Sequence, residues 1–483
     1  MNTMKGLFCC LLVFVLSAIN ISVNASIEVR AQFLTTFDGL SNNSVRYICQ
    51  DNKGFIWMST LNGLNRYDGN SFVSFRPRND RPLSLADRRG RTLLEDENGF
   101  LWIATAGDLF SCYDLKKDCF VDFTGCGEHL NHYRYIAIYS GTVWLWGEQG
   151  CRRIIYKDGK FSSDAYLQSQ RVRFVFQDSS GIIWISTNKG IYYFQDEKLE
   201  YIESTPSFQW AQSFGEKTFF ISSTGSIYKS TGKKRLEEII RIPNVQSGYD
   251  LPGELPLNGK WIIFTSDGGY SFDPVTYEFK QASSDLDISS GEVIKDNHNN
   301  YWIHNQTGEL HYANAQTGEV KVLQLMPREK VGFIDMERYS IVHDSRGIIW
   351  IATYGNGLFA YDSRTGQLQH FTADSNNSDL ITSNFLLFVM EDRSGSLWVG
   401  AEHTGVSHLK VLNEGALHLK PEASHPDDIH SNTIRMVTSM KNGDICLGTR
   451  NGEVFVYDSG LSKQKGVYKY TSNIFSICED TVG

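Results

Sequence analysis

The sequence has few of the features that mark disordered or nucleic-acid-binding chains. Only 10 of its 483 residues are proline, no low-complexity stretch occurs, and aromatic residues make up 13% of the chain. Disordered chains have the opposite composition, with few aromatic residues and many prolines and charges. The net charge of −9 gives no general attraction to nucleic acid or to an anionic membrane. The composition therefore indicates one or more large folded domains.

Motifs that carry chemistry are also missing from the sequence. We find no G-x-S-x-G, no H-E-x-x-H and no glycine-rich phosphate loop. Recurring Asp-x-x-Gly turns supply one carboxylate each, too few for a calcium ion, which takes six to eight oxygen ligands. We therefore predict no catalytic residue, no metal site and no cofactor.

The one long apolar run lies at the N-terminus. Lys5 precedes the run from Leu7 to Ile19, and small residues follow at Val23-Asn24-Ala25. This order is typical of a secretory signal peptide. We predict that residues 1–25 are removed by cleavage between Ala25 and Ser26 and that the protein is periplasmic. An uncleaved anchor is the alternative, although the run is short for a membrane span.

Seven of the nine cysteines follow the predicted signal peptide. We expect Cys49, Cys446 and Cys478 to act as small buried apolar residues. Two others, Cys112 and Cys119, flank a predicted hairpin turn and could pair. The disulfide state stays open for four cysteines: Cys112, Cys119, Cys126 and Cys151.

A phrase that repeats along the chain is its most informative feature. It reads QDNKGFIWMSTLNGLNRYDG at 50–69 and returns, for example, as HDSRGIIWIATYGNGLFAYD at 343–362. The spacing between copies runs from 36 residues (Trp184 to Phe220) to 48 residues (Trp350 to Trp398). A four-stranded propeller blade takes ~40–45 residues. The residues predicted at the tryptophan position of successive copies, which we call the phase markers, are Trp57, Trp102, Trp144, Trp184, Phe220, Ile262, Trp302, Trp350, Trp398 and Cys446.

Each unit has the short apolar runs and turn residues of a β-meander. In the first unit we predict strands at Val45–Gln50, Phe55–Thr60, Leu64–Tyr67 and Ser71–Arg76. The Asp-x-x-Gly turns suit hairpins because aspartate can bond to its own backbone and glycine accepts a positive φ. We expect the tryptophan to fill the gap between neighbouring blades.

The sequence spacing between the phase markers predicts the domain organisation. Seven markers precede the steady spacing of 48 that starts at Trp350. The predicted fold is all-β, with a seven-bladed β-propeller over 26–318 followed by an incomplete second β-propeller of about three blades over 319–483. The second ring is interpreted as truncated because the sequence ends within a repeat.

Two further segments resemble fourth strands that close rings. Propellers usually close by joining strands from both ends of the chain in one blade. We expect Gln32–Phe37 to complete the blade of Trp302 and Val320–Leu325 to complete the last blade of the second propeller.

These units resemble the two-component regulator propeller repeat. The matches are LTTFDGLSNNSVRYICQDNKGFIWMSTLNGLNRYDG at 34–69 and the recurring ED-x-x-G-x-L-W and G-L-x-x-Y-D phrases. The resemblance implies the periplasmic sensor half of a hybrid two-component histidine kinase. In that family a β-sandwich, a membrane span and kinase domains follow two propellers, members signal as dimers, and many respond to oligosaccharides. The resemblance therefore implies a homodimeric receptor that contacts the membrane only through a later span, with no nucleic-acid contact by this region and no kinase in this chain.

Candidate ligand residues lie in the loops that share one face of a propeller. The loops between second and third strands carry polar and aromatic groups suited to sugar hydroxyls and ring faces. The loop at 76–91 is rich in arginine, which grips carboxylates and sulfates, so an acidic glycan is an alternative to a neutral one. A solvated loop balanced by its own acids is the simpler interpretation. The candidates are Tyr354, Asn356, Glu402, His403, Arg450, Asn451, Arg76, Arg78 and Arg81.

Three classes of function remain open at this stage. The sequence favours a non-enzymatic, extracytoplasmic ligand sensor for oligosaccharides. The alternatives are a secreted carbohydrate-active propeller enzyme, which needs a suitably spaced pair of carboxylates, and a protein-interaction scaffold.

Overall fold

The computed structural model divides the chain into two units, Val29–Val411 and a second unit that contains Leu412–Gly483 together with Met1–Glu28. Each unit is described by itself. Ala25 and Ser26, the predicted cleavage site, lie outside the described residues, as do Arg81 and Cys126. The described residues are 27, 29–78, 80, 83–123, 130, 132–203, 205–231, 235–242, 253–265, 268–281, 292–296, 298–304, 308–325, 340–373, 380–411, 434–459, 461 and 463–479.

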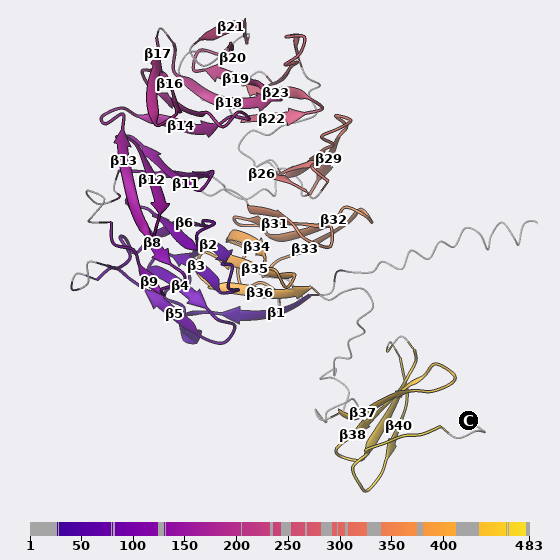
Figure 1. Cartoon of the computed structure of the whole chain (residues 1–483). Coiled ribbons are helices and arrows are strands. Elements are labelled where there is room, and N and C mark those ends of the chain that lie inside the picture. The colour runs from indigo at the N-terminus through magenta and orange to yellow at the C-terminus, as the bar shows by residue number, and fades with distance from the viewer. Residues whose placement is uncertain are drawn as a thin grey trace, which may run out of the picture. The chain divides into compact units, whose positions relative to one another are not determined.

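The described residues form ten antiparallel sheets of four strands each, numbered here in chain order (Figure 1). A short 3-10 helix, η1 (Thr36–Asp38), precedes the first sheet.

The first sheet contains β2 (Val45–Gln50), β3 (Ile56–Thr60), β4 (Gly63–Tyr67) and β5 (Phe72–Phe75), and the second contains β6 (Gly90–Glu95), β7 (Phe100–Thr105), β8 (Phe110–Asp114) and β9 (Cys119–Phe120). The third contains β10 (Tyr135–Tyr139), β11 (Thr142–Gly147), β12 (Gly150–Lys157) and β13 (Lys160–Tyr166), and the fourth contains β14 (Val172–Gln177), β15 (Ile183–Thr187), β16 (Gly190–Gln195) and β17 (Lys198–Ile202). The fifth contains β18 (Phe208–Phe214), β19 (Lys217–Ser222), β20 (Ser226–Ser230) and β21 (Leu236–Arg241).

The sixth sheet contains β22 (Gly253–Leu257), β23 (Lys260–Thr265), β24 (Gly268–Phe272) and β25 (Phe279–Gln281), and the seventh contains β26 (Glu292–Lys295), β27 (Tyr301–His304), β28 (Glu309–Ala313) and β29 (Val320–Gln324). The eighth contains β30 (Ser340–His343), β31 (Ile348–Thr353), β32 (Gly357–Asp362) and β33 (Gln367–Phe371). The ninth contains β34 (Leu386–Glu391), β35 (Ser396–Ala401), β36 (Val406–Val411) and β1 (Val29–Leu34), and the tenth contains β37 (Ile434–Ser439), β38 (Ile445–Thr449), β39 (Glu453–Tyr457) and β40 (Gln464–Lys469).

The recurring Asp-x-x-Gly-x-x-Trp phrase builds the hairpin between the first two strands of a sheet. In the first sheet, Oδ1 of Asp51 accepts hydrogen bonds from the backbone N–H groups of Lys53 (3.0 Å) and Phe55 (2.9 Å), and Gly54 has a φ of 98°. Oδ2 of Asp51 accepts a hydrogen bond from Nε1 of Trp57 at 2.7 Å. One carboxylate thus fixes the turn and satisfies a buried indole N–H. The same pairs are Asp51–Trp57, Asp96–Trp102, Asp178–Trp184, Asp296–Trp302, Asp344–Trp350 and Asp392–Trp398.

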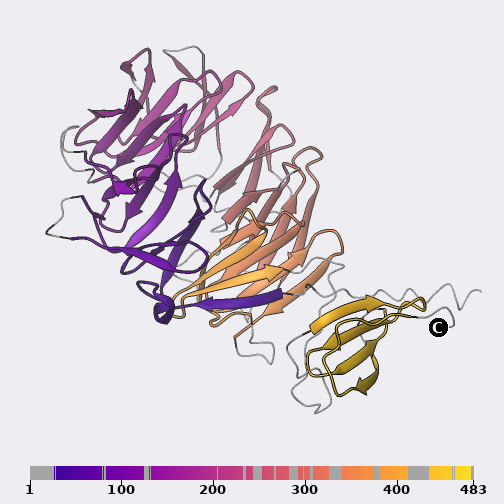
Figure 2. The same cartoon turned by 60° about the horizontal axis from the view of Figure 1, so that its bottom comes forward.

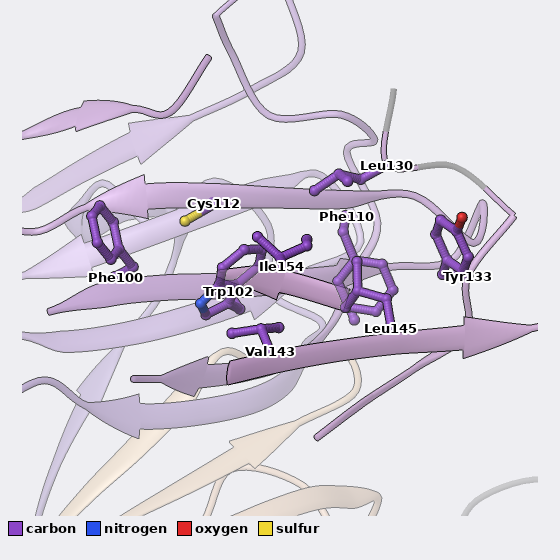
Figure 3. Close-up of a cluster of buried hydrophobic side chains, with 10 residues drawn as sticks. Phe100, Trp102, Phe110, Cys112, Leu130, Tyr133, Val143, Leu145 and Ile154 are labelled. Atoms are coloured by element: carbon purple, nitrogen blue, oxygen red, sulfur yellow. The ribbon is translucent and has the colours of Figure 1, made fainter. Parts of the chain in front are cut away.

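The tryptophan position faces the following sheet, as predicted. Trp57 is fully buried and packs edge-on against Tyr113 of the second sheet, with 5.2 Å between ring centroids. Figure 3 shows the equivalent core between the second and third sheets, where Trp102 lies among Val143, Leu145 and Ile154.

The strand registers place Ile262 and Cys446 at the same position of their sheets, as predicted. In the fifth sheet this position belongs to Phe219, which packs against the sixth sheet, whereas Phe220 packs against Trp184 of the fourth sheet. The prediction of Phe220 was therefore wrong by one residue, because two adjacent phenylalanines fit the repeat equally well in sequence.

Nine sheets form a closed series within Val29–Val411. Shared apolar clusters join each sheet to the next from the first to the eighth and join the ninth to the first. The eighth and ninth are linked by a hydrogen bond of 3.2 Å from the backbone N–H of Val389 to Oγ of Ser340. Ring closure removes the open sheet faces that a partial array would leave.

The N-terminal strand closes the ring at a different sheet from the one predicted. β1 pairs antiparallel with β36, from Val29 opposite Val411 to Leu34 opposite Val406 (Figures 1 and 2). The prediction that this segment completes the blade of Trp302 was wrong. That blade already has a fourth strand, because β29 pairs with β28 across a short local turn. The prediction that Val320–Leu325 completes a second propeller was wrong for the same reason.

The division of the chain also differs from the predicted boundary at residue 318. The compact unit continues to Val411, and the sheets of Trp350 and Trp398 belong to it. Of the ten sheets that the structure describes, the tenth alone lies in the second unit. The equal spacing of 48 residues after Trp302 reflects longer connections between sheets and does not mark a new ring.

The cysteines of the described residues are free thiols. Cys112 is buried and Cys119 is exposed, so the two do not form the pair that the hairpin suggested. Cys446 is buried as predicted, whereas Cys49 is half-buried and Cys478 is exposed. Burial raises the pKa of the Cys151 thiol to about 12, which keeps it protonated and unreactive at neutral pH.

Candidate functional site

The connections between second and third strands, and those between consecutive sheets, lie on one face of the nine-sheet unit. We call this the loop face. Tyr354 and Asn356 lie between β31 and β32, and Glu402 and His403 lie between β35 and β36. The structure therefore brings four predicted residues together on two adjacent sheets, the eighth and the ninth.

Tyr354 and Glu402 form the centre of this cluster. The hydroxyl of Tyr354 donates a hydrogen bond to Oε2 of Glu402, although the two residues are 48 positions apart in sequence. The ring of Tyr354 also packs edge-on against Phe385, with 5.2 Å between the centroids. The Phe385 side chain is 46% exposed. The result is an aromatic surface beside a carboxylate whose position is fixed by a tyrosine.

Backbone hydrogen bonds hold the loops of this cluster in place. The carbonyl of Asn384 accepts from the N–H groups of Gly355 (2.8 Å) and Gly357 (3.0 Å), and the carbonyl of Phe385 accepts from the N–H of Glu402 (3.0 Å). Gly405 ends the second loop with a φ of 86°, and a Cβ there would lie 2.2 Å from the carbonyl oxygen of Leu34. The close approach of the closing strand β1 therefore requires glycine at this position.

Two histidines flank the cluster. His403 is 75% exposed, and its Nε2 lies 3.7 Å from Oε2 of Glu402. His370 stacks on Phe359 with 4.0 Å between ring centroids and donates from Nε2 to the backbone carbonyl of Asn356 at 2.7 Å. Both histidines are exposed, but Nε2 of His370 is bonded to the loop that carries Asn356 and so helps to fix that loop.

The arrangement suits recognition of a polyhydroxylated ligand. Aromatic side chains offer a surface for sugar ring faces, and the carboxylate and imidazole offer hydrogen bonds to hydroxyls. Of the side chains named in this cluster, Glu402 alone carries a carboxylate, whereas hydrolysis of a glycosidic bond uses two. In the segments that the structure describes, no group of three or more His, Cys, Asp and Glu side chains could hold a metal ion.

Two of the predicted arginines, Arg76 and Arg78, make local contacts. Arg76 donates from Nε to the carbonyl of Asn62 (3.2 Å) and from Nη2 to the carbonyl of Ser41 (3.4 Å). Arg78 forms a salt bridge with Asp80 at 2.7 Å. These contacts match a solvated loop balanced by its own acids, the simpler of the two sequence interpretations.

Arg450 and Asn451 belong to the other unit of the chain. They occupy the exposed turn between β38 and β39 of the tenth sheet.

Sequence reasoning missed Phe385 and His370. Phe385 lies in the connection before β34, which carries no copy of the repeated phrase, so the repeat gave no signal for it. The signal that could have found it is an aromatic residue directly before a strand, on the connection that shares a face with Tyr354.

Comparison with known proteins identifies the repeat. The description "Two component regulator propeller" matches residues 39–62 and 332–355. A search of curated proteins found no match.

The solved structures that match include two extracellular domains of two-component systems and a lyase. The extracellular domain of the hybrid two-component system BT4673 from B. thetaiotaomicron is 15% identical with a TM-score of 0.36, over 89% of this chain and 64% of that domain. The extracellular domain of BT3049 from the same organism is 18% identical with a TM-score of 0.27, over 94% of this chain and 81% of that domain. Streptogramin B lyase is 12% identical with a TM-score of 0.40, over 80% of this chain and 98% of the lyase.

Across the described segments, no helix has the length and apolar character needed to cross a bilayer. Strands account for the architecture throughout those segments, and the matched repeats fall on the first and eighth sheets. This is an all-β chain that carries two-component regulator propeller repeats.

Proposed function

We propose that this chain is the extracytoplasmic ligand-sensing region of a hybrid two-component receptor and that its ligand is an oligosaccharide. The observation that carries the proposal is the match of two repeats to the two-component regulator propeller. In this proposal the N-terminal signal peptide exports the chain to the periplasm. The kinase, the membrane span and the contacts of a homodimer belong to other parts of the receptor.

The Tyr354 cluster is the proposed contact surface for the sugar. Tyr354 and Phe385 present ring edges and faces, and Glu402 is oriented by the tyrosine hydroxyl. A rigid, pre-oriented polar group loses little entropy on binding, which favours affinity. The loop face can therefore recognise a ligand without catalysing its cleavage.

Calorimetry with a panel of neutral and acidic oligosaccharides tests the proposal. We expect binding of at least one sugar, which mass spectrometry recovers uncleaved. Tyr354→Ala should weaken that binding by roughly 1–2 kcal/mol, because it removes both the ring contact and the orienting hydroxyl. Tyr470→Ala, at a tyrosine that is 57% exposed directly after β40, is the matched control and should have no effect.

Two results would contradict the proposal. Turnover of a panel sugar by the purified chain would favour the carbohydrate-active enzyme. A lack of binding by every sugar, combined with capture of a protein partner through the Tyr354 surface, would favour the interaction scaffold.

A further inference from the structure

A cavity of about 470 Å³ lies between the seventh and eighth sheets, away from the Tyr354 cluster. It opens among the hairpin turns, on the side opposite the loop face, because its lining includes the turns that follow β26, β30 and β32. Its volume falls within the ~300–1,000 Å³ typical of small-ligand sites. Nothing in the proposed loop-face site depends on it.

One wall of this cavity is aromatic. Trp302 lies at its base, with Tyr312 at 4.8 Å and Tyr361 at 5.9 Å between ring centroids. The indole N–H of Trp302 is already bonded to Asp296 at 3.1 Å. The aromatic wall therefore offers ring surface, and the polar atom of its largest member is not available to a ligand.

Each basic side chain that lines the cavity is paired with a neighbouring carboxylate. Arg346 donates to Oδ2 of Asp344 from Nε (3.0 Å) and from Nη2 (2.8 Å), and Arg364 contacts Asp362 through Nε (3.2 Å) and Nη2 (3.1 Å).

Lys321 forms a salt bridge with Glu319 at 3.2 Å. With every lysine and arginine of the lining beside a carboxylate, the cavity has fixed donors but no strong positive potential. This favours a neutral polar ligand over an anion.

Within the described residues, His343 lacks a hydrogen-bond partner for one of its ring nitrogens. It lines the cavity, and its Nδ1 is buried with no hydrogen-bond partner in the described structure. A buried polar atom without a partner is costly, but this atom has almost no surface in the open cavity. A ligand hydroxyl therefore bonds to it when the imidazole turns toward the cavity. A hydroxyl group meets the need in either tautomer, because it can donate or accept.

We propose that this cavity binds a neutral sugar ring, with its apolar face against Tyr312 and Tyr361 and a hydroxyl bonded to His343. Aromatic ring surface, fixed donors and compensated charge are what an uncharged polyhydroxylated ring needs. The cavity is a second sugar site, distinct from the loop face.

Saturation-transfer NMR with the full chain tests this proposal, with cellobiose, xylobiose, N,N′-diacetylchitobiose and digalacturonate as probes. Ser363→Trp blocks the cavity from an exposed turn position, where Ser363 donates to the carbonyl of Gly347 at 2.9 Å. Ser459→Trp, at the equivalent turn of the tenth sheet, is the matched control. Circular dichroism checks that both variants fold.

We expect a neutral disaccharide to bind, Ser363→Trp and Tyr361→Ala each to weaken that binding at least tenfold, and Ser459→Trp to leave it unchanged. Binding that is lost with Tyr354→Ala and kept with Ser363→Trp would overturn the cavity site while supporting the loop face. Binding of digalacturonate alone, or of no probe, would also overturn it.

Discussion

The ninth and tenth sheets have the same repeat and register, yet equivalent valines on their first strands differ in exposure. Val389 of the ninth sheet lies opposite Val399 and is 3% exposed, whereas Val437 of the tenth lies opposite Leu447 and is 64% exposed. Both first strands have a bulge at the same place. Local sequence therefore builds each sheet, but a neighbouring sheet is needed to bury its faces.

The largest contrast is expected at the tryptophan position. Trp102→Ala should destabilise the nine-sheet unit by about 3–5 kcal/mol, because the side chain is buried between the second and third sheets. Cys446→Ala, at the same position of the tenth sheet, should cost less than about 1 kcal/mol. Urea unfolding followed by tryptophan fluorescence and circular dichroism measures both. Equal effects would mean that the tenth sheet is packed like the others.

A smaller contrast is expected at the paired valines. Val389→Thr should cost about 1–2 kcal/mol, because it places a hydroxyl in an apolar contact without a partner. Val437→Thr should change stability by less than about 0.5 kcal/mol, because that side chain is exposed. The same unfolding assay applies. A large cost at Val437 would show that something covers this face in solution.

The smallest expected effect is on the stability of the nine-sheet unit at low pH. Burial alone would raise the pKa of Asp392, but hydrogen bonds from Ser394, Trp398 and Ser396 outweigh it and the pKa is lowered. A lowered folded pKa contributes stability that is present above the unfolded value, ~3.9, and is lost as pH falls through the folded value. The nine-sheet unit should therefore lose stability below about pH 4.

Asp392→Asn should make that loss shallower, which thermal melts between pH 2 and 6 can measure. A variant with an unchanged pH profile would contradict the role of the Asp392–Trp398 hydrogen bond.

The sequence predicted local structure well and long-range pairing poorly. The strands of the first sheet appear within one residue of the predicted starts and ends, because alternation and Asp-x-x-Gly turns act over a few positions. The aspartate was expected to fix a turn, but its second role, binding the indole of Trp57, was not foreseen. That contact depends on how the strand places the indole after the hairpin forms.

The partner of β1 could not be deduced from the repeat. Every sheet has the same apolar pattern, so any sheet with a free edge is an equal candidate for a strand from the N-terminus. The choice of β36 follows from geometry, because β1 directly precedes the first sheet and the chain leaves the ninth sheet after Val411. The Tyr354–Glu402 contact likewise depended on which sheets are neighbours.

Disulfide trapping of the closing strand tests the account most directly. Arg30 and Lys410 are exposed and lie opposite each other in β1 and β36, and directly opposed residues suit a disulfide. In a background with Cys119→Ser and Cys478→Ser, R30C/K410C should form a disulfide that mass spectrometry finds between the two peptides. R30C/K321C, which reports pairing with the sheet of Trp302, should not. A 30–321 disulfide without a 30–410 disulfide would contradict closure of a nine-sheet ring.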